Sequence, residues 1–324
     1  MLPFKCFLII LIVSNFIDAH FRSFLRGCTK RTVLYTEMVV DDIIHHGPNN
    51  LDFFIGRHIE EHPSVIQLGG FEPERLAAAA EICERVAGNY GEININCGCP
   101  SQRVSQRSFG AKLMLEPDLV REIVSTMTRR VQVPITVKCR IGVDSNDSYE
   151  ELCNFIASAH AGGAQKFIIH ARKCILKGIA VSCNLYTCNF SRNLKTILFI
   201  GLTTKQNRDI PPLKYEIVHR LVRDFPDLKF ILNGGILSLT AANSHCMPWH
   251  HSSIVQEDMN DLMVMGHSNE QSLGDVLPPV HGVMIGRAAY NNPLVRQQLI
   301  PLSLSLSLYY FIIKMHACHE PMNQ

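Results

Sequence analysis

Two cysteines, Cys97 and Cys99, stand one residue apart in the segment INCGCPS, residues 95–101. A thiol can ligate a metal, exchange with a disulfide, or release a proton near neutral pH, because its unperturbed pKa is about 8.5. No further cysteine or histidine stands at ligand spacing near this pair, and no C-x-x-C pair occurs in the chain. The sequence therefore disfavours a zinc site and leaves a redox pair or one reactive thiol as the alternatives.

Polar or small residues also occur where nearly every predicted strand ends. A histidine or lysine at one such place would be ordinary, since a lysine can extend along apolar surface. Six strand ends of this kind together favour a functional rim, because the carboxyl ends of barrel strands meet at one face. The residues are Gln67 with Gly69 and Gly70; Asn96 with residues 97–99; Lys138; His170 with Arg172; Asn233 with Gly234 and Gly235; and Gly286 with Arg287.

The elements that must position these residues alternate along the chain. Amphipathic helices are predicted over residues 73–88, 148–163 and 211–225, the second opening with Ser148 and Glu151 in capping-box spacing. This alternation favours an α/β fold, a (β/α)8 TIM barrel, over a doubly wound sheet, and no GxGxxG follows a strand. The predicted strands, mostly near-continuous apolar runs, cover residues 32–40, 64–70, 92–97, 135–140, 166–171, 229–235 and 282–287.

Composition is typical of a globular chain and conceals an uneven charge. The 324 residues are 47% hydrophobic and 19% charged, with a net charge of +2. Residues 244–280 contain five acids and no Lys or Arg, so the rest of the chain carries +7. Twelve cysteines scattered over so long a chain predict ten or eleven reduced, mostly buried thiols.

The N-terminal region contains two misleading patterns. The apolar run of residues 6–13 has signal-peptide length and is too short to span a bilayer, and the N-x-S sequons at Asn146 and Asn189 would suit secretion. The HIEEH segment, residues 58–62, matches an inverted zinc-protease pattern, but Pro63 and a predicted strand follow at once. We interpret it as a solvated lead-in to that strand and expect an intracellular protein, cytoplasmic or organellar.

Two glycine-containing turns suggest the ligand. The 233–235 turn and the Gly286–Arg287 pair each end a strand and begin a predicted helix, where free amides favour a phosphate. Such a phosphate site after the seventh and eighth strands is common in this barrel. With Lys138 and His170 facing the polar edge of an attached ring and Gln67 hydrogen-bonding it, the pattern suits flavin mononucleotide (FMN).

Nine segments carry a resemblance to a known family. In order they are LYTEMVV, HPSVIQLGG, EININCGCPS, SFGAKLM, VKCRIGVDSNDSYE, FIIHARK, NRDIPPLKYE, LNGGI and GVMIGRAAYNNP. Together they resemble the tRNA-dihydrouridine synthases, particularly the branch of the bacterial A-type enzymes, over residues 18–299. The resemblance implies FMN-dependent reduction of a uridine C5=C6 bond in the D-loop of tRNA, with NADPH reducing the flavin.

The resemblance also assigns roles. Cys99 matches the family's catalytic cysteine, which gives a proton to C5 on the face opposite to the hydride, while Cys97 is not required and is expected to be buried. Asn96 would contact the target base. The residues expected to hold FMN are Gln67, Lys138, His170, Asn233, Gly234, Gly235, Gly286 and Arg287. The residues expected to bind tRNA, around a basic loop, are Arg172, Lys173, Lys177, Lys205 and Arg208. We expect a monomer with no metal and no stable membrane insertion.

The chain departs from the family pattern in four places. Residues 1–17 are an atypical N-terminal segment, in which the first strand is predicted from Leu8 to Val13, and residues 18–299 form the FMN-binding barrel. Insertions occupy residues 180–201 and 244–280, and the atypical tail of residues 300–324 replaces the family's helical tRNA-binding domain. These departures predict an impaired enzyme. An inactive splice variant and a flavin barrel that reduces a free pyrimidine are the alternatives.

Overall fold

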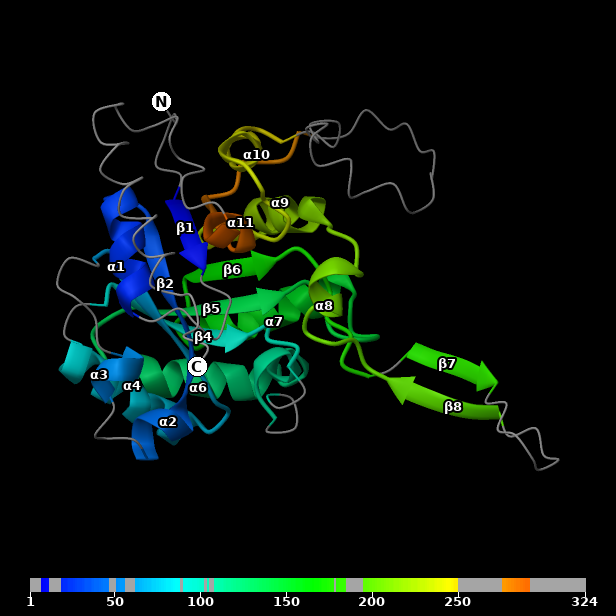
Figure 1. Ribbon diagram of the computed structural model, residues 1–324, viewed down its shortest axis with the longest axis horizontal. Coiled ribbons are helices and arrows are strands. Elements are labelled where there is room, and N and C mark those ends of the chain that lie inside the picture. The colour runs from blue at the N-terminus through cyan, green and yellow to red at the C-terminus, as the bar shows by residue number, and fades with distance from the viewer. Residues whose placement is uncertain are drawn as a thin grey trace, which may run out of the picture.

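A closed barrel of eight parallel strands forms the centre of the computed structural model (Figure 1). The structure describes residues 7–11, 19–46, 51–55, 62–87, 90–101, 104, 108–177, 179–184, 195–249 and 276–291. The strands close in the order β1-β10-β9-β6-β5-β4-β3-β2. Their bounds are β1 Phe7–Leu11, β2 Val33–Val40, β3 Ser64–Gly69, β4 Glu92–Cys97, β5 Ile135–Arg140, β6 Lys166–His170, β9 Lys229–Asn233 and β10 Gly282–Ile285. The predicted (β/α)8 barrel is confirmed.

The atypical N-terminus supplies the first barrel strand. β1 pairs with β10 on one side, Ile9 opposite Met284, and with β2 on the other, Ile10 opposite Leu34. The predicted strand is therefore present, shifted by one residue at its start. Without β1 the sheet would present two open edges, so this strand is what closes the barrel.

Strand alternation divides the residues into two populations. Successive side chains of a strand point to opposite faces of the sheet, so every second residue faces the barrel interior. The lower interior is a mainly apolar cluster in which Tyr35, Val65, Ile168, Ile231 and Met284 are buried together. The other face of each strand packs against the helices in the main core, for example Ile95.

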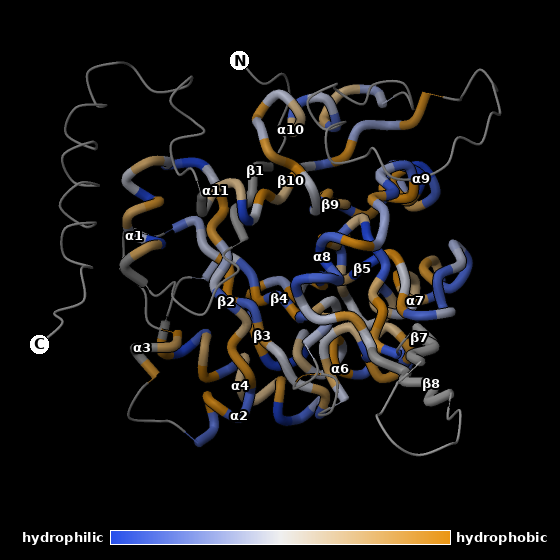
Figure 2. Tube along the Cα trace, turned by 45° about the vertical axis from the view of Figure 1, so that its right-hand side comes forward, coloured by the Kyte–Doolittle hydropathy of each residue, from blue (hydrophilic) through white to orange (hydrophobic). Residues whose placement is uncertain are grey.

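The helices cover the outside of the barrel, and along the tube of Figure 2 they alternate between hydrophobic and hydrophilic stretches. α6 packs beside α4 on one side and α7 on the other. The bounds are α1 Ala19–Cys28, α2 Asp41–His46, α3 Leu51–Ile55, α4 Pro73–Ala87, α6 Pro117–Arg130, α7 Tyr149–Ala161, α8 Gln206–Asp209, α9 Tyr215–Asp224, α10 Leu239–His245 and α11 Arg287–Asn291, with a 3-10 helix η3 Gly110–Leu115. None of the helices described is long and apolar enough to cross a membrane.

Both predicted insertions leave the barrel intact. Within the first, β7 (Ile179–Asn184) and β8 (Lys195–Ile200) pair only with each other, as an antiparallel hairpin that extends away from the barrel (Figure 1). The second leaves at Trp249 and returns at Leu277, whose main chains exchange hydrogen bonds of 2.9 and 3.0 Å. Leu277 precedes the amino end of β10, so the ends of this insertion attach on the side opposite to the strand carboxyl ends.

A buried aromatic stack holds the base of the second insertion. The His219 ring stacks on Trp249 with 4.7 Å between ring centroids. Its Nδ1 lies 2.8 Å from the Pro278 carbonyl, and its Nε2 lies 3.0 Å from Nδ1 of His245. Burial lowers the pKa of His219 to about 4 and that of His245 to about 3, so both rings are neutral at physiological pH.

Several sequence predictions lie outside the described residues. These are residues 58–61 of the HIEEH segment, the Asn189 sequon, residues 250–275 of the acidic insertion and the tail of residues 300–324. The structure does not bear on them, and they stay predictions.

The predicted capping box at α7 is present and gives a test of the local fold. Ser148 Oγ accepts from the Glu151 amide at 3.1 Å, and the Glu151 carboxylate accepts from the Ser148 amide at 3.0 Å. Ser148→Ala should lower the free energy of unfolding by about 1 kcal/mol, because it leaves helix N–H groups without acceptors. Chemical denaturation measures this change. Ser145→Ala, an exposed change three residues earlier, is the control, and an equal loss in both variants would contradict the cap's role.

Candidate active site

The carboxyl ends of five neighbouring strands bring polar side chains into one layer of the barrel. Asn96 of β4 lies opposite Lys138 of β5 in the strand register, and His170 of β6 lies opposite Asn233 of β9. Gln67 of β3 donates to Asn94, two residues before Asn96, at 2.8 Å. These residues are predicted from strand ends, and the closed barrel brings them together at its rim.

A tight turn holds Cys99 beside this layer. The side-chain oxygen of Asn96 accepts from the amides of Gly98 and Cys99 at 3.0 and 2.9 Å. On the other side of the turn, the Cys99 carbonyl accepts from the Ala111 amide at 3.0 Å. Gly110 has φ +68°, and an added Cβ would approach the Cys99 carbonyl oxygen to 2.8 Å, so this position requires glycine.

The surroundings of Cys99 hold its thiol protonated at neutral pH. Burial raises the pKa of the thiol, while a backbone hydrogen bond at Ser101 opposes the rise. The positive charges of Arg140, Lys138 and Arg208 also act to lower it. A thiol in this setting can donate a proton, and the nearby cations would stabilise the resulting thiolate.

Cys97 occupies a different environment, although it is only two residues away. It lies opposite Cys139 in the β4–β5 register and is fully buried in the core beneath the helices. Because Asn96 faces the barrel interior, its neighbour Cys97 must face outward. Burial raises the pKa of Cys97 well above its usual value. Of the two alternatives, one reactive thiol fits this arrangement.

The other cysteines broadly follow the sequence prediction. Seven described cysteines carry free thiols and five of them are buried, while Cys246 is disulfide-bonded. The seven are Cys28, Cys83, Cys97, Cys99, Cys139, Cys153 and Cys174.

Lys138 is a buried cation whose ammonium group makes no hydrogen bond within the described part of the chain. Only 7% of the residue is exposed, and it faces the interior of the barrel. Burial, with a smaller contribution from the Arg140 charge, lowers the pKa of Lys138 to about 8. A buried ammonium group of this kind calls for an anionic or hydrogen-bond-accepting ligand.

The turn after β9 is built around glycine. Gly234 and Gly235 have φ of +114° and +67°, and a Cβ on Gly234 would lie 2.6 Å from the His170 ring. Tyr215 donates to the Gly234 carbonyl at 2.9 Å, which fixes the turn. The amides of both glycines donate no hydrogen bond within the residues that the structure describes. Burial, reinforced by Arg140 and Lys138, keeps the pKa of His170 well below its usual value, so its ring is neutral.

Three arginines gather around Asp209 at the end of α8. Arg287 Nη1 lies 3.1 Å from the Asp209 carboxylate, and Arg172 donates to the Asp209 carbonyl at 3.3 Å. Arg208 is adjacent in the chain, and its buried Nε has no hydrogen-bond partner. The predicted RNA-facing and phosphate-facing arginines therefore form one positive group at the rim. Gly286, predicted beside them, directly follows β10.

The three predicted lysines lie in the same part of the chain as these arginines. Lys173 pairs with Asp147 at 2.7 Å, and Lys177 and Lys205 are exposed on the loops before and after the β7–β8 hairpin. Lys173 and Lys177 share a neighbour, since Nζ of Lys173 and the Lys177 amide donate to Asp144 at 3.4 and 2.9 Å.

Sequence reasoning missed two residues of the site. Arg140, 2% exposed, donates from Nε to the Gly98 carbonyl at 2.9 Å and from Nη1 to the Lys173 and Asn207 carbonyls at 3.1 and 3.0 Å. It thereby joins the Cys99 turn to both halves of the basic loop. Asn94 is the other. The period of the strands could have identified both, because Arg140 stands two residues after Lys138 and Asn94 stands two residues before Asn96, on the same face of the strand.

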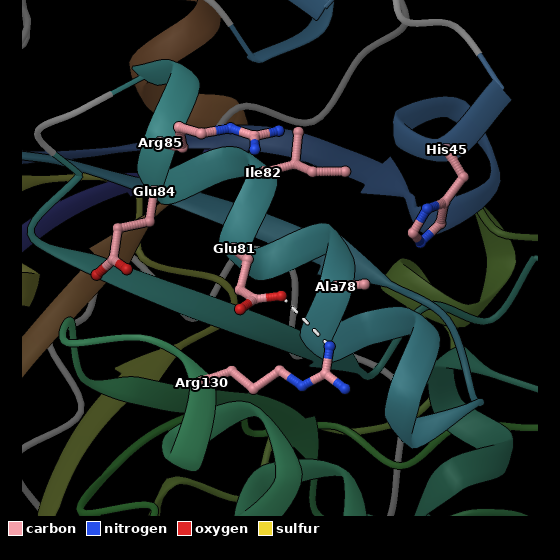
Figure 3. A pocket seen from close by; sticks show the side chains of 7 residues that line it. All are labelled: His45, Ala78, Glu81, Ile82, Glu84, Arg85 and Arg130. Carbon is pink, nitrogen blue, oxygen red and sulfur yellow. Dashed lines mark hydrogen bonds and ion pairs between the residues drawn. The ribbon is translucent and has the colours of Figure 1, made fainter.

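A surface depression of about 560 Å³ lies elsewhere, on the helical layer. Figure 3 shows Glu81 and Arg130 pointing toward one another across it, with their ion pair of 3.3 Å. It is on the outside of the barrel and shares no residue with the rim, so we do not assign the chemistry to it. Its lining residues are His45, Ala78, Glu81, Ile82, Glu84, Arg85 and Arg130.

Fold and site together define a (β/α)8 barrel with a polar rim of the kind from which barrel enzymes build active sites. The sequence profile described as Dihydrouridine synthase (Dus) matches residues 12–251, well over half of the chain. The chain belongs to the dihydrouridine synthase family.

Several curated relatives are named tRNA-dihydrouridine(20/20a) synthase. The tRNA-dihydrouridine(20/20a) synthase of Pseudomonas syringae pv. tomato is 37% identical over 268 residues, which cover 83% of this chain and 72% of the relative. Those of Synechocystis sp. and Escherichia coli O6:H1 are 39% and 40% identical. Their alignments cover 85% of this chain in both cases, and 65% and 66% of the relatives.

The two cysteine environments predict different reactivities. A thiol-alkylating reagent should modify Cys99 and spare Cys97 in the folded protein, because Cys97 is fully buried. The rate at Cys99 should rise with pH, since the fraction of reactive thiolate grows as the pH approaches the raised pKa. Tandem mass spectrometry of the peptide that carries both residues distinguishes them, with Cys99→Ser as the control. Equal labelling of the two cysteines would contradict this assignment.

Proposed function

We propose that this protein is a tRNA-dihydrouridine synthase that reduces the C5=C6 bond of a uridine in the D-loop, with FMN as cofactor and NADPH as reductant. The family membership and the names of the relatives support the reaction class. The observation that carries the proposal is Cys99, a protonated thiol held by Asn96 at the rim and acted on by three cations.

The residues at the rim fit an anionic flavin. Lys138 offers a buried ammonium group that lacks a hydrogen bond among the described residues, and the amides of Gly234 and Gly235 are uncommitted there. These groups suit ring oxygens and a phosphate, with Arg287 as a further phosphate ligand. Gln67, His170, Asn233 and Gly286 complete the proposed binding set. When bound and reduced, FMN would supply the hydride that adds to C6 of the uracil ring.

Cys99 supplies the proton in this proposal. As the C5–H bond forms, the S–H bond of Cys99 breaks, and its electron pair stays on sulfur as a thiolate. The charges of Arg140, Lys138 and Arg208 stabilise that thiolate. Solvent then reprotonates it, because the raised pKa favours the thiol.

The positive group at the rim supports tRNA as the substrate. Arg172, Arg208 and Arg287 gather at the mouth of the site, with Lys173, Lys177 and Lys205 on the adjoining loop. Side chains of this kind bind phosphates and steer an anionic polymer toward the site. Asn96, fixed beside Cys99, is the proposed contact to the target base.

Replacing the proton donor should separate two half-reactions. Cys99→Ala should abolish dihydrouridine formation in tRNA and leave flavin binding and its reduction by NADPH near wild type, because the acid acts only on the base. Cys97→Ala is the matched control and should retain most activity. Mass spectrometry of nucleosides from the tRNA measures the product. Equal loss in both variants would contradict the single-acid assignment, and activity only on a free pyrimidine would contradict tRNA as the substrate.

Lys138 predicts a pH dependence of FMN affinity. Its folded pKa of about 8 means that its charge is present below that pH and is lost as the pH rises through it. FMN affinity, measured by fluorescence titration of the flavin-free protein, should therefore fall between about pH 7 and pH 9. Lys138→Met should bind FMN about 10- to 150-fold more weakly at neutral pH, a loss of about 1.5–3 kcal/mol, and should lose this pH dependence.

The matched control for that variant is Lys173→Met. Lys173 stands near the end of the neighbouring strand, but its ammonium group is committed to Asp147 at 2.7 Å. Its replacement should leave both FMN affinity and the pH profile unchanged. An unaltered profile in Lys138→Met would show that Lys138 does not contact the flavin.

A further inference from the structure

Four polar side chains form one hydrogen-bonded line inside the barrel. In the register of β3, β4 and β5, Gln67 lies opposite Asn94, and Asn94 lies opposite Thr136. Asn94 donates to Thr136 Oγ1 at 2.9 Å, Gln67 donates to Asn94 Oδ1 at 2.8 Å, and Asn96 donates to Gln67 Oε1 at 2.7 Å. All four residues are at most 9% exposed, so water does not compete for these bonds. Neither Asn94 nor Thr136 belongs to the proposed cofactor or substrate contacts.

The main chain sets the direction of this line. The amides of Gly98 and Cys99 both point at the Asn96 side chain, and an N–H group can face only an acceptor, so that atom must be the oxygen. The Asn96 nitrogen then faces Gln67 and requires the Gln67 oxygen. The Gln67 nitrogen in turn requires the Asn94 oxygen. The orientation of three amides follows from two backbone N–H groups, and it does not depend on how oxygen and nitrogen are distinguished within the side chains.

The Thr136 hydroxyl is the acceptor for the last of the three amides. A hydroxyl accepts and donates, so it accepts from Asn94 without imposing a second direction. At the other end both lone pairs of the Asn96 oxygen are occupied by Gly98 and Cys99. Asn96 therefore has nothing left to offer a ligand except its second N–H. A bound ring must meet it with an acceptor such as a carbonyl oxygen, and a ring that presents a donor there is opposed.

We propose that Asn94, supported by Thr136, is a positioning residue that holds Gln67 and Asn96 in the one amide orientation in which Asn96 presents only a hydrogen-bond donor beside Cys99. This orientation is a property of the chain itself. Its use in selecting a uracil ring rests on the proposed function. Loss of Asn94 leaves the buried Gln67 nitrogen without an acceptor, so Gln67 turns away to find one and the Asn96 side chain loses its support.

Amide hydrogen exchange at Gly98 and Cys99, followed by NMR in the flavin-free protein, tests the positioning role. Asn94→Leu should speed this exchange about five- to tenfold, the change that loss of one net hydrogen bond produces. Thr136→Val keeps the side-chain shape but removes the hydroxyl, so it should also speed the exchange. Thr136→Ser keeps the hydroxyl and should exchange at the wild-type rate. Thr126→Val, the same change at a buried threonine of α6, should leave the exchange unaltered.

A wild-type exchange rate in both Asn94→Leu and Thr136→Val would overturn the proposal. If Asn94→Leu does not fold, Thr136→Val and its serine rescue carry the test. In the flavin-loaded protein, Thr136→Val should lower turnover on tRNA while NADPH still reduces the flavin at the wild-type rate. Faster exchange with no tRNA activity even in the wild type would contradict the proposed function and support the positioning role. Normal tRNA activity in the wild type, with unchanged exchange in the variants, would support the proposed function and contradict the positioning role.

Discussion

Polar groups inside a closed barrel must find partners within the barrel or in a bound ligand, because water is excluded from its interior. In the lower half of this barrel apolar side chains such as Ile231 and Met284 fill most of the space, and the buried Tyr35 hydroxyl is the polar group that lies among them. In the upper half, Asn94, Gln67 and Asn96 satisfy one another. Lys138, at the same level, finds no hydrogen bond in the described chain. The Lys138 ammonium group therefore indicates where a ligand would bind, and the turn that holds Cys99 lies beside it.

The same constraint explains why the insertions are compatible with the fold. Both are attached outside the barrel, where added length costs little because loop-closure entropy grows slowly with length. The two strands of the β7–β8 hairpin pair with each other, and the Trp249–Leu277 pairing lets the second insertion leave and return at one place. Neither interrupts the strands that carry the rim. The first insertion enters the basic loop and therefore bears on the proposed RNA contacts, whereas the ends of the acidic insertion attach on the opposite side of the barrel.

Sequence alone was enough to predict the elements and most of the rim. Apolar runs bounded by Gly and Pro located seven strands to within one or two residues at each end, and the capping box located the start of α7. The strand-end rule then identified Gln67, Asn96, Lys138, His170 and Asn233 without knowledge of their neighbours. These predictions succeed because they depend on local properties, namely side-chain period, caps and turns, and on one general rule about where parallel strands end.

Contacts between distant segments were decided by the tertiary structure. The difference between the Cys97 and Cys99 thiols depends on which face of β4 lies inward and on the turn after β4, in which Asn96 holds Cys99. Arg140 joins the Cys99 turn to residues more than thirty positions away, and the shift in the Lys138 pKa arises from burial that only the closed barrel creates. The orientation of the Asn96 amide follows from two backbone N–H groups. Sequence reveals which groups are present, but hydrogen bonding and desolvation depend on distances that exist only once the strands have come together.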